Sequence, residues 1–215
     1  MSSHMNAGKR PAALLAGAAM VLALSVAGVR AATVADSFDD WSTTGTQGES
    51  NWYNGYYNKT NDIDGAYEAD DFIEFDSTYW IVDHYDLDFG MGGAPWTEIY
   101  QENTHPNGDN NGAEHWTIRR WVSPQNYANG SLQWHIRKTN AACGDGVSGV
   151  LFVNGVELDR ADIGFADTTG VTRLVMRAIT AGDVIDLALT PGPSIPSADG
   201  CDGSAFRLTI FDTPP

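Results

Sequence analysis

The sequence predicts an all-β fold in which two antiparallel sheets stack as a single sandwich. No helical hydrophobic period runs through any stretch after residue 31. Short alternating or apolar runs recur instead, and Gly, Asn, Asp and Pro separate them. Many short strands with turns between them are typical of β-sandwiches and barrels, and a double sheet of the jelly-roll kind fits the chain length.

The N-terminal segment predicts export. A short basic start precedes the apolar run of residues 12–29, and a small-x-small cleavage site ends at Ala31. This pattern is typical of a secretory signal peptide, with a retained membrane anchor as the alternative. We therefore expect a signal peptide over residues 1–31 and one β-sandwich domain over residues 32–215, secreted to the extracellular space or the periplasm.

The charge balance excludes some partners. The chain has a net charge of −16, and removing residues 1–31, which hold three basic and no acidic residues, changes it to −19. Such an acidic protein repels nucleic acid and anionic lipid and attracts cations. We expect no nucleic-acid partner and, after cleavage, no membrane partner.

Each expected strand is a run of apolar or alternating residues with turn-forming residues at both ends. Asn154-Gly155 between apolar arms predicts a hairpin with a type I′ turn. Residues 181–183 predict a turn into another strand, and residues 190–203 are too rich in Pro and Gly for regular structure. The expected strands are residues 69–75, 96–100, 114–122, 130–138, 149–153, 170–178, 184–190 and 205–211.

The alternation within residues 114–122 separates two sets of side chains. Trp116, Ile118, Arg120 and Val122 share one face, and this set is core-like apart from its arginine. A half-buried arginine needs a carboxylate partner. Arg120 is therefore either a structural ion-pair partner or a ligand contact.

Cys143 and Cys201 are the two cysteines of the chain, and both lie in loops rich in Gly and Asp. Because an exported protein meets an oxidising environment, a disulfide between them is the expected state. The bridge would contribute about 4 kcal/mol in the chain-entropy model.

Aromatic residues crowd the stretch from residue 52 to residue 100. If residues 51–59 form a strand, large rings point to both of its faces, so either both faces are buried or one set of rings awaits a ligand. Sugar rings stack on aromatic planes, whereas the alternative is core packing. The hypothesis is a sugar platform of Tyr53, Tyr57 and either Trp80 or Trp96. The candidate ligand-binding residues are Trp52, Tyr53, Tyr56, Tyr57, Trp80, Trp96 and Arg120.

Several Asp-rich loops suggest calcium. Asp62 and Asp64 occupy two ligand positions of a calcium-loop template, and the match is partial. Alternate oxygens in a turn can converge on a hard cation, whereas the simpler interpretation is turn chemistry. The candidate metal ligands are Asp62, Asp64, Asp145, Asp199 and Asp202, and calcium is the expected cofactor.

The sequence contains no catalytic motif such as Gly-x-Ser-x-Gly or His-Glu-x-x-His. Carboxylates that could act in pairs are plentiful, for example Glu74 with Glu98 or Glu114. No residue is therefore assigned a catalytic role, and a small polysaccharide hydrolase or lyase is kept as an alternative.

Several motifs resemble a jelly-roll domain of secreted bacterial proteins. They are the Trp-Tyr-x-Gly-Tyr-Tyr stretch from Trp52, Arg-Arg-Trp at residues 119–121, and Gly-Asp-Gly-Val before the Asn-Gly hairpin. The similarity covers residues 48–211 and resembles carbohydrate-binding modules in architecture. It implies an accessory of polysaccharide-degrading or adhesive proteins, with a structural calcium where the terminal strands meet. Asp36, Asp39 or Asp40 would join Asp202 there.

The expected function is a secreted, calcium-stabilised, non-catalytic protein that binds a polysaccharide or a cell-surface glycan. Besides the enzyme alternative, a structural or filament-forming matrix protein remains open, in which sheet edges and rings make contacts between copies of the chain.

Overall fold

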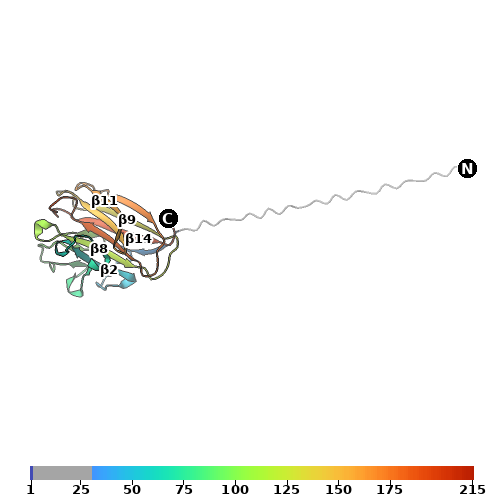
Figure 1. Ribbon diagram of the computed structural model, residues 1–215, viewed down its shortest axis with the longest axis horizontal. Helices are drawn as coiled ribbons and strands as arrows, with labels where there is room; N and C mark the ends of the chain where they lie inside the picture. The colour runs from blue at the N-terminus through green and yellow to red at the C-terminus, as the bar shows by residue number, and fades with distance from the viewer. Residues whose placement is uncertain (2–30) are drawn as a thin grey trace.

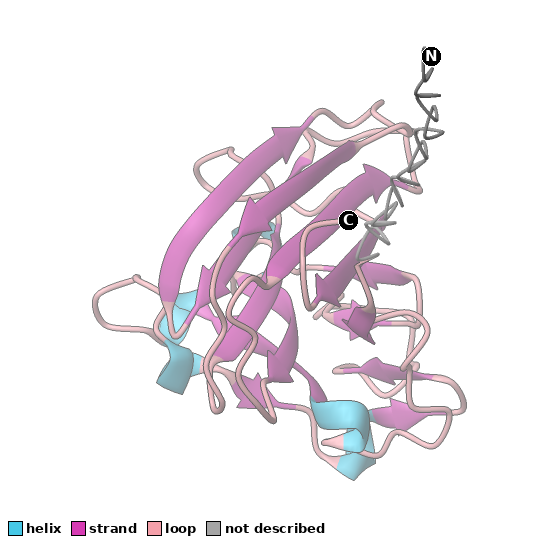
Figure 2. Cartoon of the chain, turned by 90° about the vertical axis from the view of Figure 1, so that its right-hand side faces the viewer, coloured by secondary structure: helices cyan, strands magenta, loops and turns pink. Residues whose placement is uncertain are grey.

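The computed structural model describes Met1 and residues 31–215, and these residues form two antiparallel sheets stacked face to face (Figures 1 and 2). The predicted all-β sandwich is confirmed. The predicted signal peptide falls almost wholly on residues 2–30, which lie outside the described part. No helix among the described residues is long and apolar enough to cross a membrane.

The first sheet has eight strands and the second has six. The first sheet runs β12 (Val171–Met176), β9 (Ser131–Lys138), β14 (Ser204–Phe211), β7 (Asn103–His105), β6 (Glu98–Ile99), β5 (His84–Asp86) and β4 (Trp80–Ile81), with β1 (Thr33–Asp36) pairing with β14. The second sheet runs β11 (Val156–Ile163), β10 (Val147–Val153), β13 (Val184–Thr190), β8 (His115–Val122), β2 (Trp52–Asn58) and β3 (Ile73–Glu74).

Short 3₁₀ helices link several strands, and one of them replaces an expected strand. Residues 69–75 form a single helical turn followed by only two strand residues, because Asp71 accepts a hydrogen bond from the backbone of Glu68 and caps the turn. Residues 96–100 likewise give only the two residues of β6. The helices are η1 (Glu49–Asn51), η2 (Lys59–Asn61), η3 (Ala69–Asp71), η4 (Ser77–Tyr79) and η5 (Asp109–Asn111).

The hairpin between β10 and β11 has the predicted turn. Asn154 and Gly155 have φ values of 52° and 76°, and a type I′ turn requires positive φ at both central residues. This turn places β11 at the edge of the second sheet.

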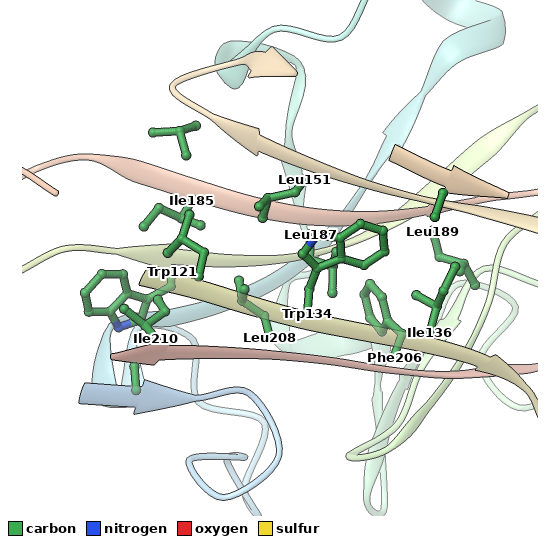
Figure 3. Packing of buried hydrophobic residues seen from close by; sticks show 14 of the residues in the cluster. Trp121, Trp134, Ile136, Leu151, Ile185, Leu187, Leu189, Phe206, Leu208 and Ile210 are labelled. Atoms are coloured by element: carbon green, nitrogen blue, oxygen red, sulfur yellow. The ribbon is translucent and has the colours of Figure 1, made fainter. Parts of the chain in front are cut away.

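The main core lies between the sheets and consists of apolar side chains that alternate inward from both (Figure 3). Trp134, Phe206 and Leu208 reach it from the first sheet, and Trp121 and Leu187 reach it from the second; none of the five is more than 1% exposed. Replacing one of these tryptophans with alanine would cost about 3–5 kcal/mol.

Strand β8 has buried apolar side chains on both of its faces. Thr117, Arg119 and Trp121 point between the sheets, whereas Trp116 and Ile118 belong to a second apolar cluster on the outer face of the second sheet. Trp116 and Ile118 are core-like as predicted, and the cluster that they join lies on the outer face of the second sheet. Both faces of β8 carry large apolar residues because both are covered.

The segment between β2 and β3 covers this outer face. Tyr67 and Phe72 from this segment pack on Tyr57, Trp116 and the inner strands of the sheet. Gly55 beneath it has no room for a side chain, since an added Cβ would lie 2.3 Å from the carbonyl oxygen of Ile73. Each face of β2 thus has one buried ring, Trp52 on the inner face and Tyr57 on the outer face, whereas Tyr53 and Tyr56 are half-buried.

The disulfide between Cys143 and Cys201 is present, as predicted. It joins the loop after β9 to the loop before β14.

Candidate functional site

A row of side chains crosses the outer face of the second sheet. Ser148 on β10 is paired in register with Asp162 on β11 and with Thr190 on β13. Trp116 on β8 is paired with Tyr57 on β2. Leu189 on β13 is paired with Thr117 on β8, and Thr190 and Trp116 are the next residues along these two strands. The row therefore runs unbroken from β11 to β2.

A hollow of about 320 Å³ opens on the Trp116 side of this row. The sheet forms its floor, and residues 190–197 form one wall. The lining residues are Lys59, Asp109, Glu114, Trp116, Ser148, Arg160, Asp162, Thr190, Gly192, Pro193, Ser194, Ile195 and Ser197.

Charged groups of both signs line the hollow beside the indole. Lys59 forms an ion pair of 2.9 Å with Glu114, and its ammonium lies 5.7 Å from the centre of the Trp116 ring. The indole nitrogen donates to the same carboxylate at 2.7 Å. Arg160 is held in place by two hydrogen bonds to Glu157. These contacts orient two cations at the hollow and leave some of their N–H groups free for a ligand.

Two hydroxyl groups add neutral hydrogen-bonding capacity. Ser148 donates to Asp162 at 2.6 Å. The hydroxyl oxygen of Ser194 is buried and has no hydrogen-bond partner among the described residues. Because an unsatisfied buried polar atom is costly, this hydroxyl marks a place where a ligand or a water molecule would bind favourably.

A second hollow of about 460 Å³ lies on the Tyr57 side of the row and is strongly acidic. Asp62, Asp64, Asp70 and Asp71 all line it. The Tyr57 hydroxyl donates to Asp62 at 2.6 Å and thereby lowers the pKa of that carboxyl group. Burial is the main reason that the pKa of Tyr57 is raised, and the neighbouring Asp62 carboxylate raises it further. This hollow would attract a cation and repel an anion.

The predicted ring platform is not one surface. Tyr53 and Tyr57 lie on the outer face of β2, whereas Trp52 and Tyr56 point the other way, and Tyr57 is only 1% exposed. Trp80 belongs to the first sheet, where it packs on Trp41 and Tyr85. Trp96 precedes β6 of the first sheet, and its ring centre lies 6.2 Å from that of His105.

Arg120 lies beneath the covering segment and forms the ion pair that the sequence left as one alternative. It donates to both oxygens of Asp186 at 2.8 and 2.9 Å. It also donates to the Tyr67 hydroxyl at 3.0 Å, and its guanidinium stacks on Phe72. The Nε and Nη2 groups of the guanidinium therefore have partners within the protein.

The predicted metal ligands lie in two places. Asp62 and Asp64 are neighbours in the acidic hollow, whereas Asp145, Asp199 and Asp202 lie near the disulfide. Among the residues that the structure describes, no group of three or more His, Cys, Asp or Glu side chains is arranged to hold a metal ion.

Side chains of the protein already bind several of these carboxylates. Asp202 pairs with Lys138 at 3.1 Å, and Asp199 accepts hydrogen bonds from the amides of Asn110 and Asn111. At the terminal strands, Arg207 pairs with Asp36 at 2.8 Å, where the resemblance implied calcium. The Lys138 and Arg207 side chains thus lie where bound cations were expected.

The carboxylates considered for glycoside cleavage lie on separate elements. Glu74 is on β3 of the second sheet, Glu98 is on β6 of the first, and Glu114 precedes β8. Burial raises the pKa of Glu74 and of Glu98. Of the three, only Glu114 lines the hollow beside Trp116.

No protein-family model matches the sequence, and a search of curated proteins finds no match. Among solved structures, the chain is similar to CBM51 from Clostridium perfringens GH95 in complex with methyl-galactose, with 11% identity over 55% of this chain and 76% of that chain and a TM-score of 0.34. It is also similar to CBM35 from Cellvibrio japonicus Abf62, with 9% identity over 76% and 94% of the two chains and a TM-score of 0.32. These likenesses are too distant to bear on the ligand.

The sequence reasoning missed the hollow beside Trp116. Trp116 was described only as core-like, and Lys59 and Arg160 were not singled out. One signal was available: basic residues are rare in this chain, so each of them has an unusual weight in its charge distribution.

Proposed function

We propose that the protein binds a glycan in the hollow beside Trp116. The observation that supports this proposal is the combination of an indole, hydroxyl groups and oriented charges of both signs in one hollow of about 320 Å³. Small-ligand sites are concave and pair an apolar surface with a few placed polar groups. A sugar unit presents C–H faces to the indole and hydroxyl groups to the polar wall.

The proposal includes action outside the cell. The disulfide supports it, since disulfides persist in oxidising compartments. A non-catalytic role is also proposed, with the whole site serving to hold a glycan rather than to cleave it.

Calcium remains part of the proposal, at the acidic hollow that contains Asp62 and Asp64. Carboxylate oxygens in a turn are the ligands that calcium prefers. Neither the ion nor its geometry is needed for the contacts that we propose between the glycan and the Trp116 hollow.

The test is a glycan array followed by calorimetric titration of the best ligand, run both with calcium and with a chelator. Lys59→Met and Arg160→Met each remove a hydrogen-bonding cation from the hollow, and we expect each to weaken binding by about tenfold or more. Arg173→Met, on the exposed edge strand β12, is the matched control and should bind as the wild type does.

Two results would overturn the glycan site. One is the absence of binding to any glycan by the folded wild-type protein. The other is that Lys59→Met and Arg160→Met bind as tightly as Arg173→Met. Calcium stabilisation is a separate question, and a melting temperature unchanged by the chelator would contradict it.

A further inference from the structure

A lysine and an aspartate form a fully buried pair beside the disulfide. Lys138 ends β9, and Asp202 lies just before β14, two residues ahead of the Ser204 that is paired in register with Lys138. Both side chains are 0% exposed, and the Lys138 Nζ lies 3.1 Å from Asp202 Oδ1. The pair is separate from the hollow that we propose for a glycan.

The hydrogen bonds of this pair do not suit an ammonium and a carboxylate. A lysine ammonium carries three N–H donors, and Lys138 has two acceptors, the Cys201 carbonyl oxygen at 2.8 Å and Asp202 Oδ1. Asp202 Oδ2 is buried and has no partner among the described residues. Buried ion pairs are favourable only where further hydrogen bonds satisfy the remaining donors and acceptors.

Complete burial with too few hydrogen-bond partners favours the uncharged forms of both groups, because a charge removed from water is costly unless its partners satisfy it. A neutral amine and a neutral carboxylic acid are the species that can condense, and the amine nitrogen lies 3.1 Å from one oxygen of the carboxyl group that it would attack.

We propose that Lys138 Nζ and Asp202 Cγ form an intramolecular amide bond. The amine attacks Cγ, and the bond between Cγ and Oδ2 breaks. Oδ2 leaves as water with one proton from the amine and the proton of the carboxylic acid. The remaining Oδ1 becomes the amide oxygen, so the step needs no oxidant, reductant or co-substrate.

The amide removes each defect of the ion pair. Its one N–H keeps the Cys201 carbonyl as its acceptor, and the orphaned oxygen Oδ2 is gone. Neither residue then carries an ionisable group, so no charge can form at this buried position. The product joins the end of β9 to the start of β14 covalently.

The experiment is intact-mass spectrometry of the protein as expressed, with its N-terminus determined and its disulfide reduced. Reduction is necessary because the bridge between Cys143 and Cys201 would otherwise join the same two segments. We expect the wild-type mass to be lower than the sequence mass by one water molecule. Proteolysis should release a branched peptide that joins Lys138 to Asp202.

Two variants locate the bond. Lys138→Arg keeps a buried cation but cannot form the amide, and it should have its full sequence mass. Asp202→Asn should lose ammonia instead of water, because the leaving group is then an amide nitrogen. If Lys138→Arg fails to fold, the branched wild-type peptide and the Asp202→Asn mass still test the bond.

A folded wild-type protein with its full sequence mass would overturn the proposal. So would a loss of water that maps to a site other than these two residues.

Discussion

At the scale of single residues, His115 shows how burial changes the chemistry of a side chain. It is 5% exposed on β8, where its Nδ1 lies 2.8 Å from the Thr97 hydroxyl and its ring packs 5.1 Å from Tyr56. Its Nε2 is buried without a partner among the described residues. Burial therefore lowers the pKa of His115 to about 4.

This pKa predicts how stability depends on pH. The folded protein holds His115 neutral, whereas the unfolded chain takes up the proton near pH 6.5. Stability due to this group is thus complete above pH 6.5 and is lost as the pH falls towards 4, by on the order of 3 kcal/mol. Urea unfolding between pH 4 and pH 8 measures the loss.

His115→Gln should lack this component of the pH dependence. His105 and His135 also have lowered pKa values, so the variant keeps some slope, and the difference between the two curves isolates His115. Parallel curves for the wild type and the variant would show that His115 does not titrate as described.

At the scale of elements, the segment between β2 and β3 turns an outer sheet face into a second interior. Tyr67 from this segment donates a hydrogen bond of 2.7 Å to Asp186, which is 0% exposed and also pairs with Arg120. The segment therefore depends on a buried ion pair as well as on apolar contacts.

Removing one member of this pair should be worse than removing both. Arg120→Met leaves Asp186 charged, buried and without its cation, and we expect a loss of about 3–5 kcal/mol of unfolding free energy. Combining Arg120→Met with Asp186→Leu should restore much of that loss. Denaturant unfolding of the two variants makes the comparison, and a single variant as stable as the double variant would contradict it.

The same segment explains where sequence reasoning succeeded and where it failed. Alternation identified the long strands and showed which β8 side chains share a face. It could not show which face points between the sheets, because the covering segment makes both faces apolar. The strands β4 to β7 have only two or three residues each, which is too short for any period to be read.

At the scale of the whole molecule, the disulfide and the proposed amide constrain nearly the same loop. The disulfide spans 58 residues, and the Lys138–Asp202 bond would enclose it. A second cross-link across a loop that is already closed removes little further entropy from the unfolded chain.

The cost of losing the disulfide should therefore depend on Lys138. Replacing both cysteines with serine should cost about 4 kcal/mol in a Lys138→Arg background and clearly less in the wild type. Denaturant unfolding of the four proteins measures this difference. Equal costs in the two backgrounds would mean that Lys138 contributes no second cross-link.

The candidate site also belongs to this scale. The sequence predicted an acidic β-sandwich protein with a cluster of aromatic residues, and the fold class is confirmed. The hollow, however, combines Lys59, Trp116, Arg160 and Ser194 from four distant parts of the chain. Only strand register brings them together, and register is set by pairings that no local pattern contains.

The pairing of β1 with β14 has a mechanical consequence. The two strands are antiparallel, Thr33 lies opposite Phe211, and Ala32 donates a hydrogen bond to Asp212. Tension applied between residues 32 and 212 would open their hydrogen bonds one after another, as a zipper opens, instead of loading them all at once. The N-terminal strand would peel away first under a small force, while β14 stays anchored to β9.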